Sequence, residues 1–342
     1  MRNGSKKEIK QLSFYSNIIS VILFIMISGC SNNSEKTFDV QGHRGARGLR
    51  PENTLAGFEF VMDLGVTTIE LDVGVTKDLF VVVNHDEYIS SKLCHSTDDS
   101  FPFNGNNKYY LKDLTLSQVK SFECGSKNPE INRFPEPPRM NIPGESIPTL
   151  DELFQLALNK NSTVRFNIEI KLDPTKDRTV PLVTFVQSVV DVVEANQMTD
   201  RVVIQSFNWA VIEKVKQLQP AITTAALLGT KSGLPTESGE ASPWTNGIHF
   251  DEVGQSSLGL LNAAKGYVDI FSPSGLIIVP IAPEYLNSTV DEIKKAGFPV
   301  IPWTINEKSQ MKFLINLGVD GIITDYPDQL LDLLKEMKIS VQ

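Results

Sequence analysis

Residues 68–84 of this 342-residue chain read TIELDVGVTKDLFVVVN, and this stretch decides the fold. It contains two apolar, strand-like runs, Thr68–Val75 and Phe80–Asn84, with only a handful of residues between them. Two parallel strands need a crossover of about a dozen residues or more, so these runs can pair only as an antiparallel hairpin that turns near Lys77 and Asp78. The hairpin therefore counts as one strand of a parallel sheet, which extends past its neighbours and folds back.

The position of the turn also predicts the register of the hairpin. Because the turn lies about midway between Asp72 and His85, we expect these two residues to face each other across the two strands. That register would bring a carboxylate and an imidazole together at one end of the sheet.

From Phe38 onward the chain alternates short apolar runs with amphipathic segments, a pattern typical of βαβ units and a parallel sheet. Besides the hairpin, the expected strands are Asp39–Gly42, Val164–Ile170, Val202–Ser206, Thr223–Leu228, Val268–Phe271, Val300–Thr304 and Gly321–Thr324. The expected helices are Thr54–Leu64, Thr149–Asn159, Val180–Asn196, Trp209–Gln217, Ser257–Lys265, Pro283–Ala296, Glu307–Asn316 and Gln329–Lys338. With the hairpin counted once, this pattern predicts an α/β fold, a TIM-type (β/α)8 barrel over residues 38–342.

The alternation lapses between Glu87 and Ser146, in a segment rich in Asn, Pro, Ser and Asp. The segment is too long for an ordinary loop, and it begins directly after His85 and Asp86. We therefore expect residues 87–146 to be a small insertion that caps the top of the barrel.

The first thirty residues have the features of an export signal. A basic start is followed by an apolar run, Ile18–Ile27, that is too short to span a bilayer as a helix. The run ends in Ile27-Ser28-Gly29-Cys30, which resembles the bacterial lipobox. We expect residues 1–30 to be a lipoprotein signal peptide and residues 31–37 a linker. Lipidation of Cys30 would anchor an exported protein to a membrane, at the periplasmic face or the cell surface. The alternative is an ordinary signal peptide with an incidental Cys.

Export would expose the two remaining cysteines to oxidising conditions. Cys94 and Cys124 both fall in the insertion, so a disulfide between them is expected. The alternative is two unpaired thiols in a surface segment.

The composition limits the kinds of partner. The chain has 41 acidic and 32 basic residues and a net charge of −9, which argues against nucleic acid as a partner. A ligand that carries phosphate would need local cations or a metal ion.

Ionisable residues gather at the ends of two expected strands. Residues two apart on a strand point to the same face, so Glu70 and Asp72 converge, as do Glu169 and Lys171. Each pair ends its strand on the side where parallel barrels form their active sites. Glu70, Asp72 and Glu169 could hold one hard dication through oxygen ligands. A single acidic pair is more often a surface ion pair or a cap, but two pairs with histidines beside them favour a metal site.

Several motifs together resemble the signature of the glycerophosphodiester phosphodiesterase family. In chain order they are His43-Arg44-Gly45, Pro51-Glu52-Asn53-Thr54, Glu70-Leu71-Asp72, His85-Asp86, Asn167-Ile168-Glu169-Ile170-Lys171, Pro302-Trp303-Thr304 and Gly321-Ile322-Ile323-Thr324-Asp325-Tyr326-Pro327. The resemblance covers essentially Phe38 to the C-terminus. It implies a TIM-type barrel, one bound Mg²⁺ or Ca²⁺, and hydrolysis of glycerophosphodiesters to sn-glycerol 3-phosphate and an alcohol.

The chemistry of the individual residues agrees with that reaction. His43 and His85 are suited to proton transfer in both directions, because an unperturbed imidazole has a pKa near neutrality. One would activate the nucleophile and the other would protonate the leaving alcohol. Arg44 would clamp the phosphate through paired N–H groups, and Lys171 would add positive charge.

Two further residues have a weaker link to the substrate. Glu52 would orient either Arg44 or a metal-bound water, and Trp303 would wall the pocket where the glycerol lies. Plain core packing is the alternative for Trp303. The family hairpin often turns through Asp-Gly, whereas this chain has Asp78-Leu79. Because Leu disfavours a positive φ, a different turn type is expected.

Two other functions compete with this one. A lysophospholipase D or sphingomyelinase D type of phosphodiesterase would keep the metal site and act on lipid substrates, to which a lipid anchor would bring it close. A binding protein that has lost catalysis would have damaged His or carboxylate positions, and none of these positions is damaged here.

Overall fold

The computed structural model describes residues 37–103, 107–278 and 288–341. The expected signal peptide, Cys30 and all of the expected linker except its last residue lie outside these ranges. The unit Thr37–Gln342 contains all the elements described below. No helix within the described ranges is long and apolar enough to cross a membrane.

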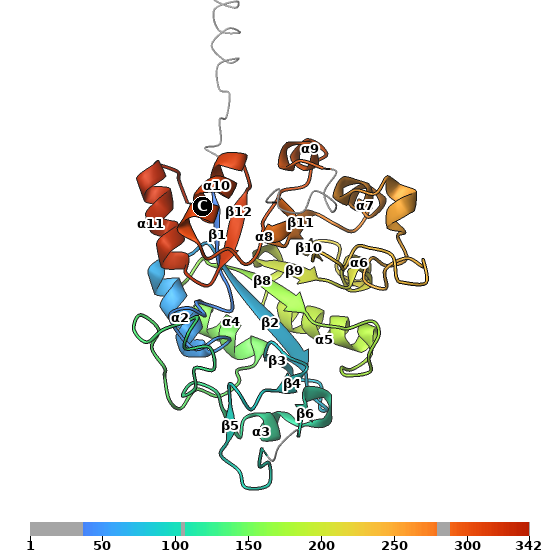
Figure 1. Cartoon of the computed structure of the whole chain (residues 1–342). Helices are drawn as coiled ribbons and strands as arrows, with labels where there is room; N and C mark the ends of the chain where they lie inside the picture. Colours follow the sequence, from blue (N-terminus) through green and yellow to red (C-terminus); the bar gives the residue numbers. More distant parts are fainter. Residues whose placement is uncertain (1–36, 104–106, 279–287, 342) are drawn as a thin grey trace, which may run out of the picture. The chain divides into compact units, whose positions relative to one another are not determined.

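Parallel strands curl into a barrel that is lined on the outside by helices (Figure 1). In order along the sheet, the strands are β11 (Ile270–Pro273), β10 (Thr223–Leu228), β9 (Val202–Ser206), β8 (Arg165–Ile170), β2 (Thr68–Val75), β1 (Asp39–Gly42) and β12 (Gly321–Thr324). Every neighbouring pair in this order is parallel. The strand predicted at Val268–Phe271 begins two residues later than expected.

The segment 299–305 closes the ring between β11 and β12. On one side, the backbone N–H groups of Ile301 and Trp303 donate to β11 at 2.9 and 3.1 Å. On the other side, the backbone N–H of Ile323 in β12 donates to the carbonyl of Pro302 at 3.0 Å. The predicted strand Val300–Thr304 is therefore present as the eighth position of the barrel. It forms isolated bridges to β11 and not a regular ladder.

The helices follow the predicted alternation with the strands. They are α2 (Leu55–Leu64), α4 (Leu150–Asn159), α5 (Leu182–Ala195), α6 (Trp209–Leu218), α7 (Ser257–Ala263), α9 (Val290–Lys295), α10 (Lys308–Leu317) and α11 (Pro327–Met337), with a short α8 (Gly275–Ile278) that was not predicted. The start of α4 is fixed by a capping box, in which Thr149 and Glu152 each accept a backbone N–H of the other. The part of the predicted helix Pro283–Ala296 that precedes residue 288 lies outside the described ranges.

The hairpin forms, but its register differs from the prediction by one residue. Strand β3 (Val81–Val83) pairs antiparallel to β2, with Val73 opposite Val83. The backbone N–H of Asn84 then donates to the carbonyl of Asp72 at 3.0 Å. Asp72 therefore faces Asn84, and the prediction that it faces His85 was wrong.

The turn of the hairpin explains this shift. The backbone N–H of Thr76 donates to the carbonyl of Phe80 at 3.0 Å, so the turn is centred on Asp78. Leu79 adopts a left-handed φ of 67°, a conformation that a Leu side chain disfavours. Its side chain is 54% exposed. The Leu at this position therefore takes the positive φ that a Gly adopts without strain.

The insertion builds a small lobe beside the end of the hairpin (Figure 1). Two short antiparallel pairs shape it, β4 (Tyr88–Ile89) with β6 (Tyr109–Tyr110) and β5 (His95–Ser96) with β7 (Phe122–Glu123). It also contains a 3₁₀ turn (Leu111–Asp113) and α3 (Leu116–Val119). A disulfide joins Cys94 to Cys124. Apolar side chains gather around Phe122 in a cluster separate from the barrel core.

The later part of the insertion lies against the loop after β1 and the residues that follow β12. The guanidinium of Arg133 lies 3.2 Å from a carboxylate oxygen of Asp325. Phe134 packs against Tyr326 with 6.1 Å between ring centroids, and Arg47 lies over the Phe134 ring at 5.1 Å. The insertion is thus attached to the barrel close to the carboxyl ends of its strands.

Candidate active site

Three carboxylates meet at the carboxyl ends of β2 and β8. Glu70, Asp72 and Glu169 each offer one oxygen, and these oxygens lie within 4.8 Å of one another. All three side chains are buried. The cause is local: Asp72 pairs with Glu169 in the ladder, and alternation along β2 turns Glu70 to the same face as Asp72. The structure therefore brings together the three metal ligands predicted from the sequence.

The charges of this cluster are only partly balanced by the protein. Burial, with Asp72 and Glu169 nearby, raises the pKa of Glu70 well above its usual value. Burial likewise raises the pKa of Glu169. Asp72 is buried too, but Lys171, His85 and Arg44 hold its pKa well below the usual range. A hard dication fits such a site, because it would offset the repulsion among three buried carboxylates whose oxygens lie within 4.8 Å of one another.

Neutral side chains fix the orientation of the carboxylates. The amide of Gln205 donates to Glu70 at 2.9 Å, and the amide of Asn53 donates to Asp72 at 3.0 Å. Sequence reasoning assigned no role to either residue. Gln205 lies near the end of β9. Polar residues at the carboxyl ends of barrel strands tend to lie in the active site, so its position in the sequence could have indicated a role.

A tight turn after β1 places the backbone of Arg44 against Glu70. At Gly42, a Cβ atom would lie 2.2 Å from the carbonyl oxygen of Gly45, so only Gly fits there. Arg44 has a φ of 51°, and its N–H donates to Glu70 at 3.0 Å. The first of the predicted motifs therefore supports the acidic cluster through its backbone as well as through its side chains.

The side chain of Arg44 lies between two acidic groups. Its Nη1 donates to Glu52 at 2.8 Å, and its Nε lies 3.3 Å from Asp72. Arg47 holds the other oxygen of Glu52 at 2.7 Å. Burial opposes ionisation of Glu52, yet Arg44 and Arg47 lower its pKa. It is therefore a fixed anion that orients Arg44, the first of the two roles predicted for it.

His43 is held by an aspartate that sequence reasoning did not single out. Its Nδ1 lies 2.6 Å from a carboxylate oxygen of Asp325, and its Nε2 lies 3.9 Å from Glu70. Asn306 donates to the second oxygen of Asp325 at 2.6 Å. Burial opposes ionisation of Asp325, but His43, together with Asn306 and Arg47, lowers the pKa of this carboxyl to about 2. Asp325 directly follows β12. Its position at the carboxyl end of the last strand could therefore have indicated a role in the active site.

His85 and Lys171 complete the site from β3 and β8. His85 Nδ1 lies 2.8 Å from Asp86, so each histidine has a carboxylate on its Nδ1. Lys171 Nζ lies 2.7 Å from Glu169 and 3.3 Å from Asp72. Although burial opposes it, Glu169 and Asp72 raise the pKa of Lys171 to about 12, which keeps its ammonium charged.

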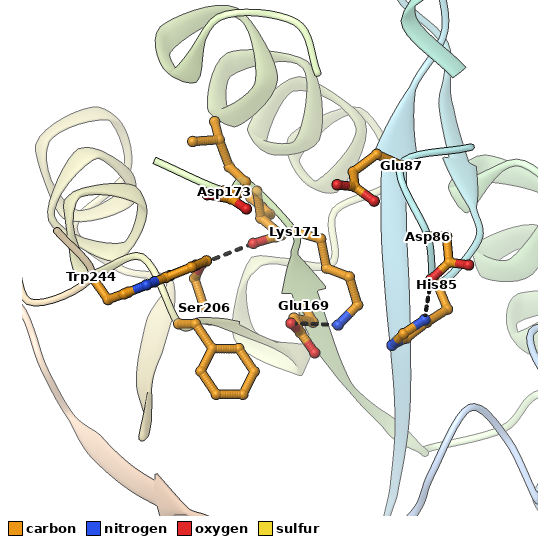
Figure 2. Close-up of a pocket in the computed structure, with 11 residues that line it drawn as sticks. His85, Asp86, Glu87, Glu169, Lys171, Asp173, Ser206 and Trp244 are labelled. Atoms are coloured by element: carbon orange, nitrogen blue, oxygen red, sulfur yellow. Dashed lines mark hydrogen bonds and ion pairs between the residues drawn. The ribbon is translucent and has the colours of Figure 1, made fainter. Parts of the chain in front are cut away.

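A cavity of about 200 Å³ opens beside these groups. Figure 2 shows His85 on one side of it, Trp244 on the opposite side, and Glu169 with Lys171 between them. Trp303 is not among the residues that line this cavity. It packs edge to face on Phe207, which does line it, with 5.3 Å between ring centroids. The contact predicted between Trp303 and glycerol stays a prediction.

A (β/α)8 barrel with acids, histidines and anion-binding cations at the carboxyl ends of its strands has the architecture of a barrel enzyme. The comparison with protein families is consistent with this class. Residues 43–329 match the model of the glycerophosphoryl diester phosphodiesterase family, and the chain belongs to that family.

Individual relatives support the same assignment. A glycerophosphodiester phosphodiesterase of Caldanaerobacter subterraneus is 31% identical over 87% of this chain and 98% of its own length. A human lysophospholipase D is 25% identical over 85% of this chain and 84% of its own. A crystal structure from Silicibacter pomeroyi, provisionally named a glycerophosphoryl diester phosphodiesterase, has a TM-score of 0.74 and 26% identity, covering 90% and 96% of the two chains. The TIM-type barrel and the hydrolase class predicted from the sequence are confirmed.

Proposed function

We propose that the protein hydrolyses glycerophosphodiesters to sn-glycerol 3-phosphate and an alcohol in a metal-dependent reaction. The observation that carries this proposal is the acidic cluster of Glu70, Asp72 and Glu169, with two charged cations and two histidines around it. Membership of the family and the name of the Caldanaerobacter relative support the same substrate class.

Glu70, Asp72 and Glu169 would hold the metal ion. Their carboxylate oxygens are hard ligands, so we propose Mg²⁺ or Ca²⁺. Polarisation of the phosphoryl oxygen is the chemistry that such an ion supplies when bound.

The remaining groups would bind the phosphate and move protons. Arg44 is held by Glu52, and its remaining N–H groups would contact the phosphate, while Lys171 would add its charge from the other side of Asp72. Asp325 accepts a hydrogen bond from Nδ1 of His43 and thereby leaves Nε2 free to exchange a proton with the substrate. Asp86 holds His85 in the same way. We propose that one histidine activates the nucleophile and the other protonates the leaving alcohol.

One assay tests this function directly. The protein should release sn-glycerol 3-phosphate from glycerophosphocholine and glycerophosphoethanolamine, and it should do so only with a divalent cation present. Lysophosphatidylcholine belongs in the same assay as the competing substrate. Release from neither of the two small diesters, with the folded protein and added metal, would overturn the proposal.

A second candidate function uses the same site on lysophospholipids. Two observations favour it: the human relative carries the name lysophospholipase D, and Leu79 and Phe80 expose about half of their apolar side chains at the tip of the hairpin. A lipid chain would need to pass the insertion, so the insertion would decide between the two substrate classes.

The disulfide should influence that choice. A small cavity lies between the Cys94–Cys124 bond and the residues around His85. The double variant Cys94→Ser/Cys124→Ser should lose roughly 2–4 kcal/mol of stability, and its looser insertion should admit bulkier lipids. We expect the ratio of kcat/KM for glycerophosphocholine over lysophosphatidylcholine to fall while metal-dependent hydrolysis persists. The ratio is compared with that of the wild type, whose thiols are titrated in parallel. An unchanged ratio would show that the insertion does not select the substrate.

We also propose that residues 1–30 form a lipoprotein signal peptide and that lipidation of Cys30 anchors the exported protein to a membrane. The apolar run and the Ile27-Ser28-Gly29-Cys30 motif support this proposal. The variant Cys30→Ser should move the protein from the membrane fraction to the soluble fraction, and an unchanged distribution would contradict a lipid anchor.

A further inference from the structure

A chain of buried amide side chains runs between the strands of the barrel and ends at the acidic cluster. Gln41, Asn167 and Gln205 come from β1, β8 and β9, which lie near one another in the sheet (Figure 1). All three side chains are buried. At one end of the chain, Gln205 donates to Glu70 at 2.9 Å. At the other end, Gln41 donates to Asp39 at 2.8 Å, so the chain links the metal site to a carboxylate at the start of β1.

The carboxylates at the two ends fix the direction of the outer amides. A carboxylate accepts hydrogen bonds and has none to donate. Asp39 is also paired with Arg165 at 3.1 Å. Gln41 must therefore turn its amide nitrogen toward Asp39, and Gln205 must turn its amide nitrogen toward Glu70. The carbonyl oxygens of both glutamines consequently point to the middle of the chain.

Asn167 meets both of these oxygens with a single nitrogen. Its Nδ2 donates to Gln41 at 2.8 Å and to Gln205 at 3.0 Å, which uses both N–H bonds of the amide. Its own oxygen, Oδ1, is buried and has no hydrogen-bond partner among the described residues. Because an unpaired buried acceptor lowers the stability of a fold, the two donated hydrogen bonds are what this residue contributes.

We propose that Asn167 is a positioning residue for the metal ion, an inference that rests on the metal site of the proposed function. Its hydrogen bond to Gln205 keeps the amide nitrogen of Gln205 turned toward Glu70. If that amide turned over, its oxygen would face the carboxylate of Glu70 and repel it from Asp72 and Glu169. The effect passes through Gln205, since neither N–H bond of Asn167 goes to a carboxylate.

Metal affinity tests this role without any turnover. Asn167→Asp keeps the shape of the side chain and replaces its two donors by an acceptor, and Asn167→Leu removes the donors without burying a charge. Each variant should bind Mg²⁺ or Ca²⁺ about 10- to 100-fold more weakly in a calorimetric titration, the range found for residues that orient metal ligands. Raising the metal concentration by the same factor should restore kcat for glycerophosphocholine, with little change in KM for this diester.

Thr224→Val in β10 is the matched control. Thr224 is buried as well, and its hydroxyl donates to the backbone carbonyl of Tyr267 at 2.7 Å, outside the amide chain. This variant and both Asn167 variants should lower the melting temperature, because each loses a buried hydrogen bond. Thr224→Val should nevertheless bind the metal like the wild type. Asn167→Leu should remain folded even if the buried charge of Asn167→Asp prevents folding.

A double variant separates positioning from general support of the core. If Asn167 acts through Gln205, Asn167→Leu/Gln205→Leu should bind the metal no more weakly than Gln205→Leu alone. Multiplicative losses, or wild-type affinity in folded Asn167→Leu, would overturn the inference and leave the proposed function intact.

The wild type distinguishes the remaining outcomes. If it binds neither Mg²⁺ nor Ca²⁺, the inference and the metal-dependent function both fail. If it binds the metal, with Asn167→Leu binding more weakly, but hydrolyses no glycerophosphodiester, the proposed function fails and the positioning role of Asn167 stands.

Discussion

Exhaustive chelation should abolish phosphodiester hydrolysis by this protein, and added Mg²⁺ or Ca²⁺ should restore it. The reason is the acidic cluster: Glu70, Asp72 and Glu169 are buried with their oxygens within 4.8 Å of one another, and the protein supplies too little positive charge to balance them. Glu70→Gln removes one of the three carboxylates and should lower metal affinity or kcat by at least about 100-fold. Mutation of a residue that only orients a metal ligand already lowers metal affinity or activity by up to about 100-fold.

Binding gives a readout of this site that does not depend on turnover. A metal that binds only the folded protein stabilises it by about 2.7 kcal/mol when its concentration is 100 times Kd. The melting temperature of the wild type should therefore rise with added Mg²⁺ or Ca²⁺, and that of Glu70→Gln should not. Glu336→Gln in α11 is the matched control and should respond like the wild type. Full activity after chelation, together with no metal-induced rise in melting temperature, would remove the metal from this account.

Replacement of either histidine by Ala should reduce kcat by about 10²–10⁴, because each variant loses a positioned proton-transfer group. In the double variant His43→Ala/His85→Ala the losses should be less than multiplicative, since both residues serve one reaction. His249 provides the matched control. It is held by a backbone carbonyl at 2.9 Å within the loop between β10 and α7, and His249→Ala should keep kcat. A near-normal kcat in His85→Ala would show that His85 does not take part in proton transfer.

Measurement of kcat also tests the contact between His43 and Asp325, which was not predicted from the sequence. Asp325→Asn keeps the shape of the side chain but removes the charge that holds Nδ1 of His43 at 2.6 Å. We expect kcat to fall by about 10- to 100-fold, less than in His43→Ala, with little change in KM. An unchanged kcat would mean that Asp325 only supports the fold.

The motifs at the strand ends could be predicted from the sequence because they depend on local geometry. Alternation along a strand puts Glu70 beside Asp72 and Glu169 beside Lys171 on the same face, whatever the rest of the chain does. The parallel barrel then brings the carboxyl ends of neighbouring strands together. The short link between Thr68–Val75 and Phe80–Asn84 likewise allowed only a hairpin.

The register of that hairpin could not be predicted, because it depends on the turn. One residue more or less in the turn moves every cross-strand pair, and Leu79 adopts a φ that its residue type disfavours. The chain tolerates this conformation where contacts around it hold the turn. Asp78 makes such a contact, because its carboxylate accepts a hydrogen bond at 3.0 Å from the backbone N–H of Leu116 in the insertion.

The sequence by itself thus predicted the barrel, from the alternation of strand-like and helical segments along the chain. It also placed the three carboxylates and the two histidines at strand ends, from the spacing within one or two strands. Only the tertiary structure decided which residues orient them. Asp325 reaches His43, and Arg133 reaches Asp325, across separations of 282 and 192 residues. Trp244 meets Phe207 from the loop that follows β10. No local periodicity records such contacts, because they arise when the closing of the ring and the docking of loops bring distant strand ends to one place.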